Sequence, residues 1–193
     1  STYRTSEVGT EIPMSAINSM WVWIPRYKYR IPSNIGSSSA VTSPPQIDVI
    51  FENGTNTTGE SLADCPIDAT DCYYTHPAFR DGSSVYKSTA YDQGGWDEEL
   101  EGIWVGKFET SGSTTTPTIK PDVDSISNKT FTTIFDTSLK FAGGTRNTSN
   151  GTVTFSGNAT YGLTSSTDTH MMKNTEWGAV AYLSQSEYGK MGN

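Results

Sequence analysis

The sequence predicts an α+β fold of short antiparallel strands, long irregular loops and one late helix. Its apolar runs are short and lie far apart, and stretches rich in Ser, Thr, Asn, Gly and Pro separate them. A convincing helical repeat occurs only near the C-terminus. A chain of 193 residues is long enough to bury one core. We therefore expect a single domain over residues 20–193, preceded by a lead-in segment over residues 1–19.

The late helix is expected over about residues 174–186. Asn174 is a good N-cap because its side-chain oxygen can accept a hydrogen bond from the first turn. Glu176 then lies where the helix dipole favours a negative charge. The face expected to pack against a sheet consists of Trp177, Val180, Ala181 and Ser184. Because the helix has no cluster of reactive side chains, we do not expect it to be catalytic.

Apolar and aromatic runs predict strands at residues 20–24, 27–31, 47–51 and 100–109. The first run is apolar on both faces, which is typical of a buried strand. The second alternates aromatic and basic residues, as a strand with one solvated face does. One face of the last run is expected to consist of Trp104, Gly106 and Phe108. Residues 151–155 fit a further strand, and residues 131–139 fit either a helix or a strand.

The stretches between these elements are polar, and we expect loops at residues 32–46 and 110–130. Residues 52–98 show no regular pattern, which is unusual for so long a stretch in a compact domain. We expect aromatic residues, a disulfide or an ion to hold it in place, or a short helix to lie within it.

Composition favours an extracellular protein. Charged residues are scarce at 18%, whereas uncharged polar residues suited to surface loops are abundant. The net charge of −8 disfavours binding to nucleic acid and to anionic membranes, because both need a basic surface. No apolar run reaches the length of a membrane-spanning helix. The chain starts at Ser1 without a signal peptide, so we expect a mature ectodomain or a trimmed piece of one.

Two cysteines, Cys65 and Cys72, bound a short loop that a disulfide could close. Such a bond would contribute about 2 kcal/mol and implies an oxidising compartment. The rival interpretation is a zinc site, which two sulfurs with no nearby His support poorly. N-x-S/T sequons mark exposed loops and accept N-linked glycans in some secretory systems. They begin at Asn53, Asn56, Asn128, Asn147, Asn150 and Asn158.

Three blocks of the sequence resemble, in the same order, three blocks of one superfamily. They read W-V-W-I-P-R-Y-K-Y-R-I at 21–31, G-I-W-V-G-K-F-E-T at 102–110 and T-H-M-M-K-N-T-E-W-G-A-V-A-Y-L at 169–183. They are similar to two strands and the E-W helix of C-type-lectin-like domains of the formylglycine-generating-enzyme (sulfatase-modifying factor) type. The chain is closer still to bacterial surface proteins in which such a domain follows a pilin-like anchor. The resemblance implies a C-type-lectin-like version of the α+β fold.

The family pattern continues past this helix with a segment that carries the last core strands and, in the true enzymes, the catalytic cysteines. The sequence stops at Asn193 without that segment. We therefore expect that the C-terminal part of the domain is missing, comes from another molecule, or is laid out differently. Cys65 and Cys72 precede the helix and match no catalytic pair. The resemblance thus implies a scaffold rather than an enzyme, with no catalytic residue carried over.

Other catalytic arrangements have little support in the sequence. His76 and His170 are the only histidines, and both are expected to be surface or capping residues rather than members of a Ser/His/Asp triad. Carboxylates that could serve glycoside hydrolysis are Asp97, Glu98, Glu99 and Glu101. A run of this kind is typical of a solvated face, because glycosidase carboxylates come from separate strands.

The long irregular region offers two kinds of candidate binding residue. A structural Ca²⁺ would take oxygen ligands, and the candidates are Asp64, Asp68, Asp71, Asp92, Asp97 and Glu98, although neither of their two groups has a recognised ligand spacing. Aromatic candidates for ligand binding are Tyr73, Tyr74, Tyr86, Tyr91 and Trp96. Tyr and Trp give a large contact area with little loss of entropy, which suits a sugar or protein ligand. Alternatively they hold the loop against the core, which we favour for Trp96.

Together these observations favour a non-enzymatic extracellular binding or adhesion module displayed on a bacterial surface or pilus. Its expected partner is a surface glycan or a protein ligand. The alternative is a structural subunit that self-associates into an extracellular filament, completed by strand addition from a neighbouring chain. A third hypothesis is an enzyme of the formylglycine-generating type, which oxidation of a sulfatase-type Cys peptide would support. We expect no cofactor other than Ca²⁺.

Overall fold

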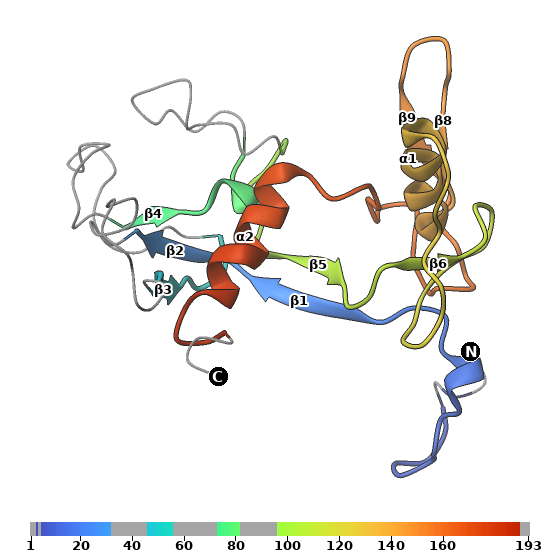
Figure 1. Cartoon of the computed structure of the whole chain (residues 1–193), viewed down its shortest axis with the longest axis horizontal. Helices are drawn as coiled ribbons and strands as arrows, with labels where there is room; N and C mark the ends of the chain where they lie inside the picture. The colour runs from blue at the N-terminus through green and yellow to red at the C-terminus, as the bar shows by residue number, and fades with distance from the viewer. Residues whose placement is uncertain (1–2, 4, 32–45, 56–72, 82–95, 190–193) are drawn as a thin grey trace. The chain divides into compact units, whose positions relative to one another are not determined.

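The computed structural model describes residue 3 and residues 5–31, 46–55, 73–81 and 96–189 (Figure 1). It divides into two compact units. The first comprises Ser1–Val22 and Val105–Met171, and the second comprises Trp23–Trp104 and Met172–Asn193. Both units combine short strands with one α-helix, which confirms the α+β class. The lectin-like arrangement and the predicted domain limits stay predictions.

The second unit is built on a three-stranded antiparallel sheet with the order β3-β2-β4. The central strand β2 (Tyr27–Arg30) pairs with β3 (Asp48–Phe51) and with the two-residue β4 (Tyr74–Thr75). A 3-10 turn, η2 (Pro77–Phe79), follows β4 within the region expected to be irregular. Separately, β1 (Trp21–Pro25) pairs with β5 (Gly102–Gly106). The strands predicted at 20–24, 27–31, 47–51 and 100–109 are therefore confirmed, the first shifted by one residue and the other three shorter than predicted.

Helix α2 (Asn174–Ser184) packs against the central strand of this sheet (Figure 1). The buried Tyr27 hydroxyl donates a hydrogen bond of 2.6 Å to the Ala179 carbonyl. The Tyr29 and Tyr182 rings lie 4.9 Å apart between their centroids. The predicted helix is thus confirmed in position, and it ends two residues earlier than expected.

The predicted cap and the predicted buried face of this helix are wrong. The N-cap is Lys173, whose backbone N–H donates to a Glu176 carboxylate oxygen at 2.7 Å, and Asn174 is already helical. Because this capping contact turns Glu176 inward, the buried positions are Glu176 and Ala179. Trp177 is 66% exposed instead.

The first unit contains α1 (Phe131–Leu139) beside the hairpin of β8 (Gly144–Arg146) and β9 (Val153–Phe155). The ambiguous segment 131–139 is a helix because Thr130 caps it, accepting a hydrogen bond of 3.2 Å from the Thr133 N–H. The unit also contains two 3-10 turns, η1 (Met14–Ala16) and η3 (Lys140–Ala142). Arg146 clamps the hairpin to the helix through two hydrogen bonds to Asp136, at 2.8 and 3.0 Å.

A second hairpin lies in a segment expected to be loop. Strand β6 (Thr110–Gly112) pairs with β7 (Pro117–Ile119). Its residues are mostly Thr, Ser and Gly, so it lacks the apolar alternation that would have predicted it. Ser111 is nevertheless fully buried, because its hydroxyl is hydrogen-bonded to Thr118 across the pair.

Candidate functional site

Two exposed tryptophans from paired strands form the candidate site, which we call the tryptophan pair. Trp23 on β1 and Trp104 on β5 have ring centroids 5.1 Å apart and planes tilted by 52°. Their side chains remain 40% and 63% exposed. The expectation that both faces of the first strand are buried is therefore wrong at Trp23 and at its neighbour Val22. Aromatic rings held together at a surface suit stacking on a sugar or packing in a protein interface.

A glycine leaves the space that one ring of this pair occupies. The Trp23 indole lies directly over Gly102, and a Cβ at that position would overlap both the indole and the Ile24 carbonyl oxygen. Ile24 and Ile103, the neighbours of these residues on the two strands, are buried. The tryptophan pair is therefore held on a backbone whose opposite face is anchored in the core. The aromatic residues in the two runs could be recognised from the sequence as part of strands. The sequence did not show that the two strands pair and so bring Trp23 and Trp104 together.

The predicted aromatic residues are only partly described. Tyr86 and Tyr91 lie outside the described residues, and Tyr73 and Tyr74 are half-buried. Tyr73 faces cations rather than open solvent, with the Lys28 ammonium 5.7 Å and the Arg30 guanidinium 5.0 Å from its ring centroid. The loop around β4 thus uses Tyr73 for local packing.

Trp96 is held against the rest of the second unit. Its indole N–H donates a hydrogen bond of 2.9 Å to the Ala78 carbonyl, and the Lys173 ammonium lies 3.5 Å from its ring centroid. These contacts support the interpretation that Trp96 fixes its loop rather than meeting a ligand.

The metal and disulfide predictions fall largely outside the described residues. Asp64, Asp68, Asp71 and Asp92 lie there, as do Cys65 and Cys72. Asp97 and Glu98 are described and exposed. In the described ranges, no three His, Cys, Asp or Glu side chains come together in a way that could hold a metal ion. The Ca²⁺ site and the disulfide stay predictions.

The sequons differ in what their asparagine side chains do. Asn53, Asn128, Asn147 and Asn150 are exposed, whereas Asn56 lies outside the described residues. Asn158 is half-buried, and its amide N–H donates to the Lys140 carbonyl at 3.1 Å. A glycan at Asn158 would replace that contact, so this sequon fits a structural role better than a glycan.

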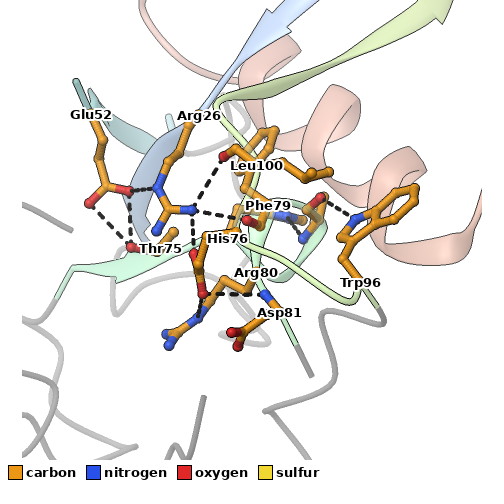
Figure 2. Close-up of polar contacts among 11 residues, drawn as sticks. Arg26, Glu52, Thr75, His76, Phe79, Arg80, Asp81, Trp96 and Leu100 are labelled. Atoms are coloured by element: carbon orange, nitrogen blue, oxygen red, sulfur yellow. Dashed lines mark hydrogen bonds and ion pairs between the residues drawn. The ribbon is translucent and has the colours of Figure 1, made fainter. Parts of the chain in front are cut away.

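A buried arginine joins four segments of the second unit (Figure 2). The Arg26 side chain is fully buried and donates to the buried Glu52 carboxylate at 2.8 Å. It also donates to the Phe79 carbonyl at 2.9 Å and to the Glu99 carboxylate at 2.5 Å. The Thr75 hydroxyl also donates to the Glu52 carboxylate oxygens, at 3.1 and 3.2 Å. We call these residues the Arg26 cluster.

The Arg26 cluster changes the interpretation of the carboxylate run. Glu99 is half-buried and pairs with the buried Arg26, so the expectation of a uniformly solvated face is wrong at this residue. Asp97, Glu98 and Glu101 are exposed, as expected. The buried Glu52 carboxylate and the half-buried Glu99 carboxylate both face the Arg26 guanidinium, and this pairing offsets the cost of removing charge from water. The cluster therefore organises the fold.

Neither histidine completes a catalytic triad with the described residues. His76 is buried, so the surface expectation is wrong, but its ring caps η2 by accepting a hydrogen bond of 3.2 Å from the Ala78 N–H. Burial lowers the pKa of His76 from 6.5 to about 3, so the ring is neutral at physiological pH. His170 pairs with the exposed Asp168 at 3.1 Å.

Comparisons with protein-family models, with curated proteins and with solved structures find no match for this chain. Within the described ranges, neither α-helix has the length and apolar character needed to cross a bilayer.

Proposed function

We propose that this chain is a non-enzymatic extracellular binding or adhesion module of a bacterial surface or pilus. The observation that carries the proposal is the tryptophan pair, because two large rings are left exposed on a backbone that fixes their positions. Rigid aromatic anchors lose little entropy on binding, so they often dominate recognition surfaces. The sequence resemblance and the acidic, polar composition support the same interpretation.

The test is binding to arrayed surface glycans and to extracellular proteins. We expect Trp23→Ala and Trp104→Ala each to weaken binding by about 2 kcal/mol, or roughly thirtyfold in Kd, as truncation of an aromatic hot spot does. Trp177→Ala is the control, because Trp177 is at least as exposed as either member of the pair but lies on α2, with no ring contact to another Trp in the described part of the chain. Urea unfolding checks that each variant is folded. Equal loss in all three variants, or no loss at the tryptophan pair, would contradict the proposal.

A second candidate is a filament subunit completed by strand addition. The observation that favours it is the pairing of β1 with β5 alone, which leaves an outer edge on both strands within the described residues. An open edge can template pairing with another chain. Light scattering over a range of concentrations separates the two candidates. A mass near 21.0 kDa at every concentration would exclude self-association under those conditions, whereas growth into polymers would favour the filament.

The enzyme hypothesis is tested by incubating the chain with a sulfatase-type Cys peptide and following oxidation of its thiol. Formation of the aldehyde product would contradict the proposed binding role. We expect none, because the resemblance carries over no catalytic cysteine.

A further inference from the structure

We propose that Asn53 is a site of spontaneous covalent modification, at which the side-chain amide is converted to a carboxylate through a cyclic imide with Gly54. The chain contains two Asn–Gly pairs, Asn53–Gly54 and Asn150–Gly151. Glycine favours this reaction because it places no Cβ beside its own nitrogen and tolerates backbone conformations that other residues avoid. The inference does not depend on the proposed binding function.

The reaction needs only water. The Gly54 backbone nitrogen loses its proton and attacks Cγ of Asn53, which forms a new N–C bond. The bond from Cγ to the side-chain nitrogen breaks, and that nitrogen leaves with a proton as ammonia. Water then opens the five-membered imide at either carbonyl, giving aspartate or isoaspartate. No oxidant, reductant or cofactor takes part.

The turn after β3 suits this chemistry. Asn53 is exposed, and Gly54 has a left-handed φ of 63°. The Glu101 carboxylate is the nearest group to the open side of Gly54, since its Oε1 lies 3.9 Å from the position a Cβ would occupy there. A carboxylate beside the turn can assist removal of the Gly54 amide proton.

The other Asn–Gly pair is protected by its own hydrogen bonds. Asn150 is exposed, and Gly151 has a similar φ of 78°. However, the Asn150 side-chain oxygen accepts from the Thr152 N–H at 3.0 Å, and the Gly151 N–H donates to the Asn147 carbonyl at 2.8 Å. The Gly151 N–H must leave the Asn147 carbonyl before its nitrogen can lose the proton and attack Cγ. The cost of losing that hydrogen bond should slow the reaction at Asn150 roughly fivefold relative to Asn53.

Modification at Asn53 would act on the Arg26 cluster. Asn53 follows Glu52, whose carboxylate is buried against Arg26 and whose backbone N–H donates to the Arg26 carbonyl at 3.0 Å. Aspartate would add a negative charge beside this carboxylate. Isoaspartate would also lengthen the main chain by one carbon directly after Glu52. The second unit would therefore acquire a strained position as the protein ages.

The test follows deamidation of the full-length folded protein at mildly alkaline pH by peptide mass mapping and by release of ammonia. We expect the Asn53 peptide to convert roughly fivefold faster than the Asn150 peptide, as the hydrogen bond of the Gly151 N–H predicts. The same protein in concentrated urea is the control, because unfolding removes that hydrogen bond and should bring the two rates together. Equal rates in the folded protein, or faster conversion at Asn150, would overturn the inference.

A variant tests the part assigned to the neighbouring carboxylate. Glu101→Gln should slow conversion at Asn53 severalfold and leave Asn150 unchanged. If the rate at Asn53 does not change, the carboxylate has no part in the reaction. If both sites change together, the substitution has altered the fold rather than the chemistry, and the assignment to Glu101 fails.

Discussion

Lowering the pH from 6.5 towards 3 should destabilise the protein through one side chain, His76. Its ring is buried among Tyr27 and Tyr29 of β2, Phe79 of η2 and Tyr182 of α2. A proton added to this ring would lose most of its hydration, and the nitrogen that now accepts the Ala78 N–H could no longer do so if it received that proton. Burial keeps the folded pKa of His76 near 3, against 6.5 for an ordinary histidine.

The sign of the effect follows from which state binds the proton. Below pH 6.5 the unfolded chain is protonated while the folded chain excludes the proton, so stability falls with pH until the folded pKa is reached. The contribution of the neutral ring is complete above pH 6.5 and lost by about pH 3. The gap of about 3.5 pKa units corresponds to about 5 kcal/mol, of which about 2 kcal/mol is lost between pH 6.5 and 4.5.

Urea unfolding at closely spaced pH values between 6.5 and 4.5 measures this loss. Asp136 does not interfere, because its hydrogen bonds to Arg146 hold its pKa below the usual range and hence outside this window. His76→Asn should flatten the pH dependence, since Asn does not titrate and still offers an oxygen to cap η2. His170→Asn replaces the other histidine and serves as the control. An unchanged slope in His76→Asn, or an equal flattening in His170→Asn, would refute the reasoning.

Three further substitutions test individual contacts by their effect on the free energy of unfolding. Arg26→Met should lower it by about 3–5 kcal/mol because Glu52 would keep a buried charge without its partner, and adding Glu52→Gln should recover part of the loss. If the double variant is no more stable than Arg26→Met, burial of the carboxylate is not the cause. Tyr27→Phe should cost about 1 kcal/mol through loss of the hydrogen bond to α2, and an unchanged urea midpoint would contradict that contact. Gly102→Ala should lower the free energy of unfolding by about 1–3 kcal/mol, because the added Cβ would displace Trp23. The same displacement should shift the tryptophan fluorescence. An unaltered spectrum would show that Trp23 does not lie over Gly102.

The elements predicted well from the sequence are those whose pattern is local. Strand β2 alternates aromatic and basic residues within a few positions, and helix α2 is marked by polar residues at its start and a glycine after its end, so the positions of both follow from nearby residues. The buried face of α2 cannot be predicted in this way, because it depends on how the helix begins and on which element it packs against. The hydrogen bond between Lys173 and Glu176 fixes the start of the helix with Glu176 turned inward, and Trp177 is left exposed.

The candidate site could be predicted only in part. The aromatic runs containing Trp23 and Trp104 were evident, but their proximity depends on the pairing of β1 with β5 across about 80 residues of sequence. The sequence instead drew attention to the aromatic residues between 73 and 96, among which it favoured Trp96 as a residue that holds its loop. The number of aromatic residues in a stretch does not show which rings from distant strands will lie side by side at the surface.

The Arg26 cluster has a consequence for the order in which the chain folds. The contacts of Arg26 span 26, 53 and 73 residues of sequence. Closing loops of that length costs entropy before any contact compensates for it, and a lone guanidinium gains nothing from leaving water early. We therefore expect these contacts to be absent from the folding transition state. Contacts that form after the barrier mainly slow unfolding. The cluster should therefore lower the unfolding rate of the second unit and lengthen the lifetime of its folded state.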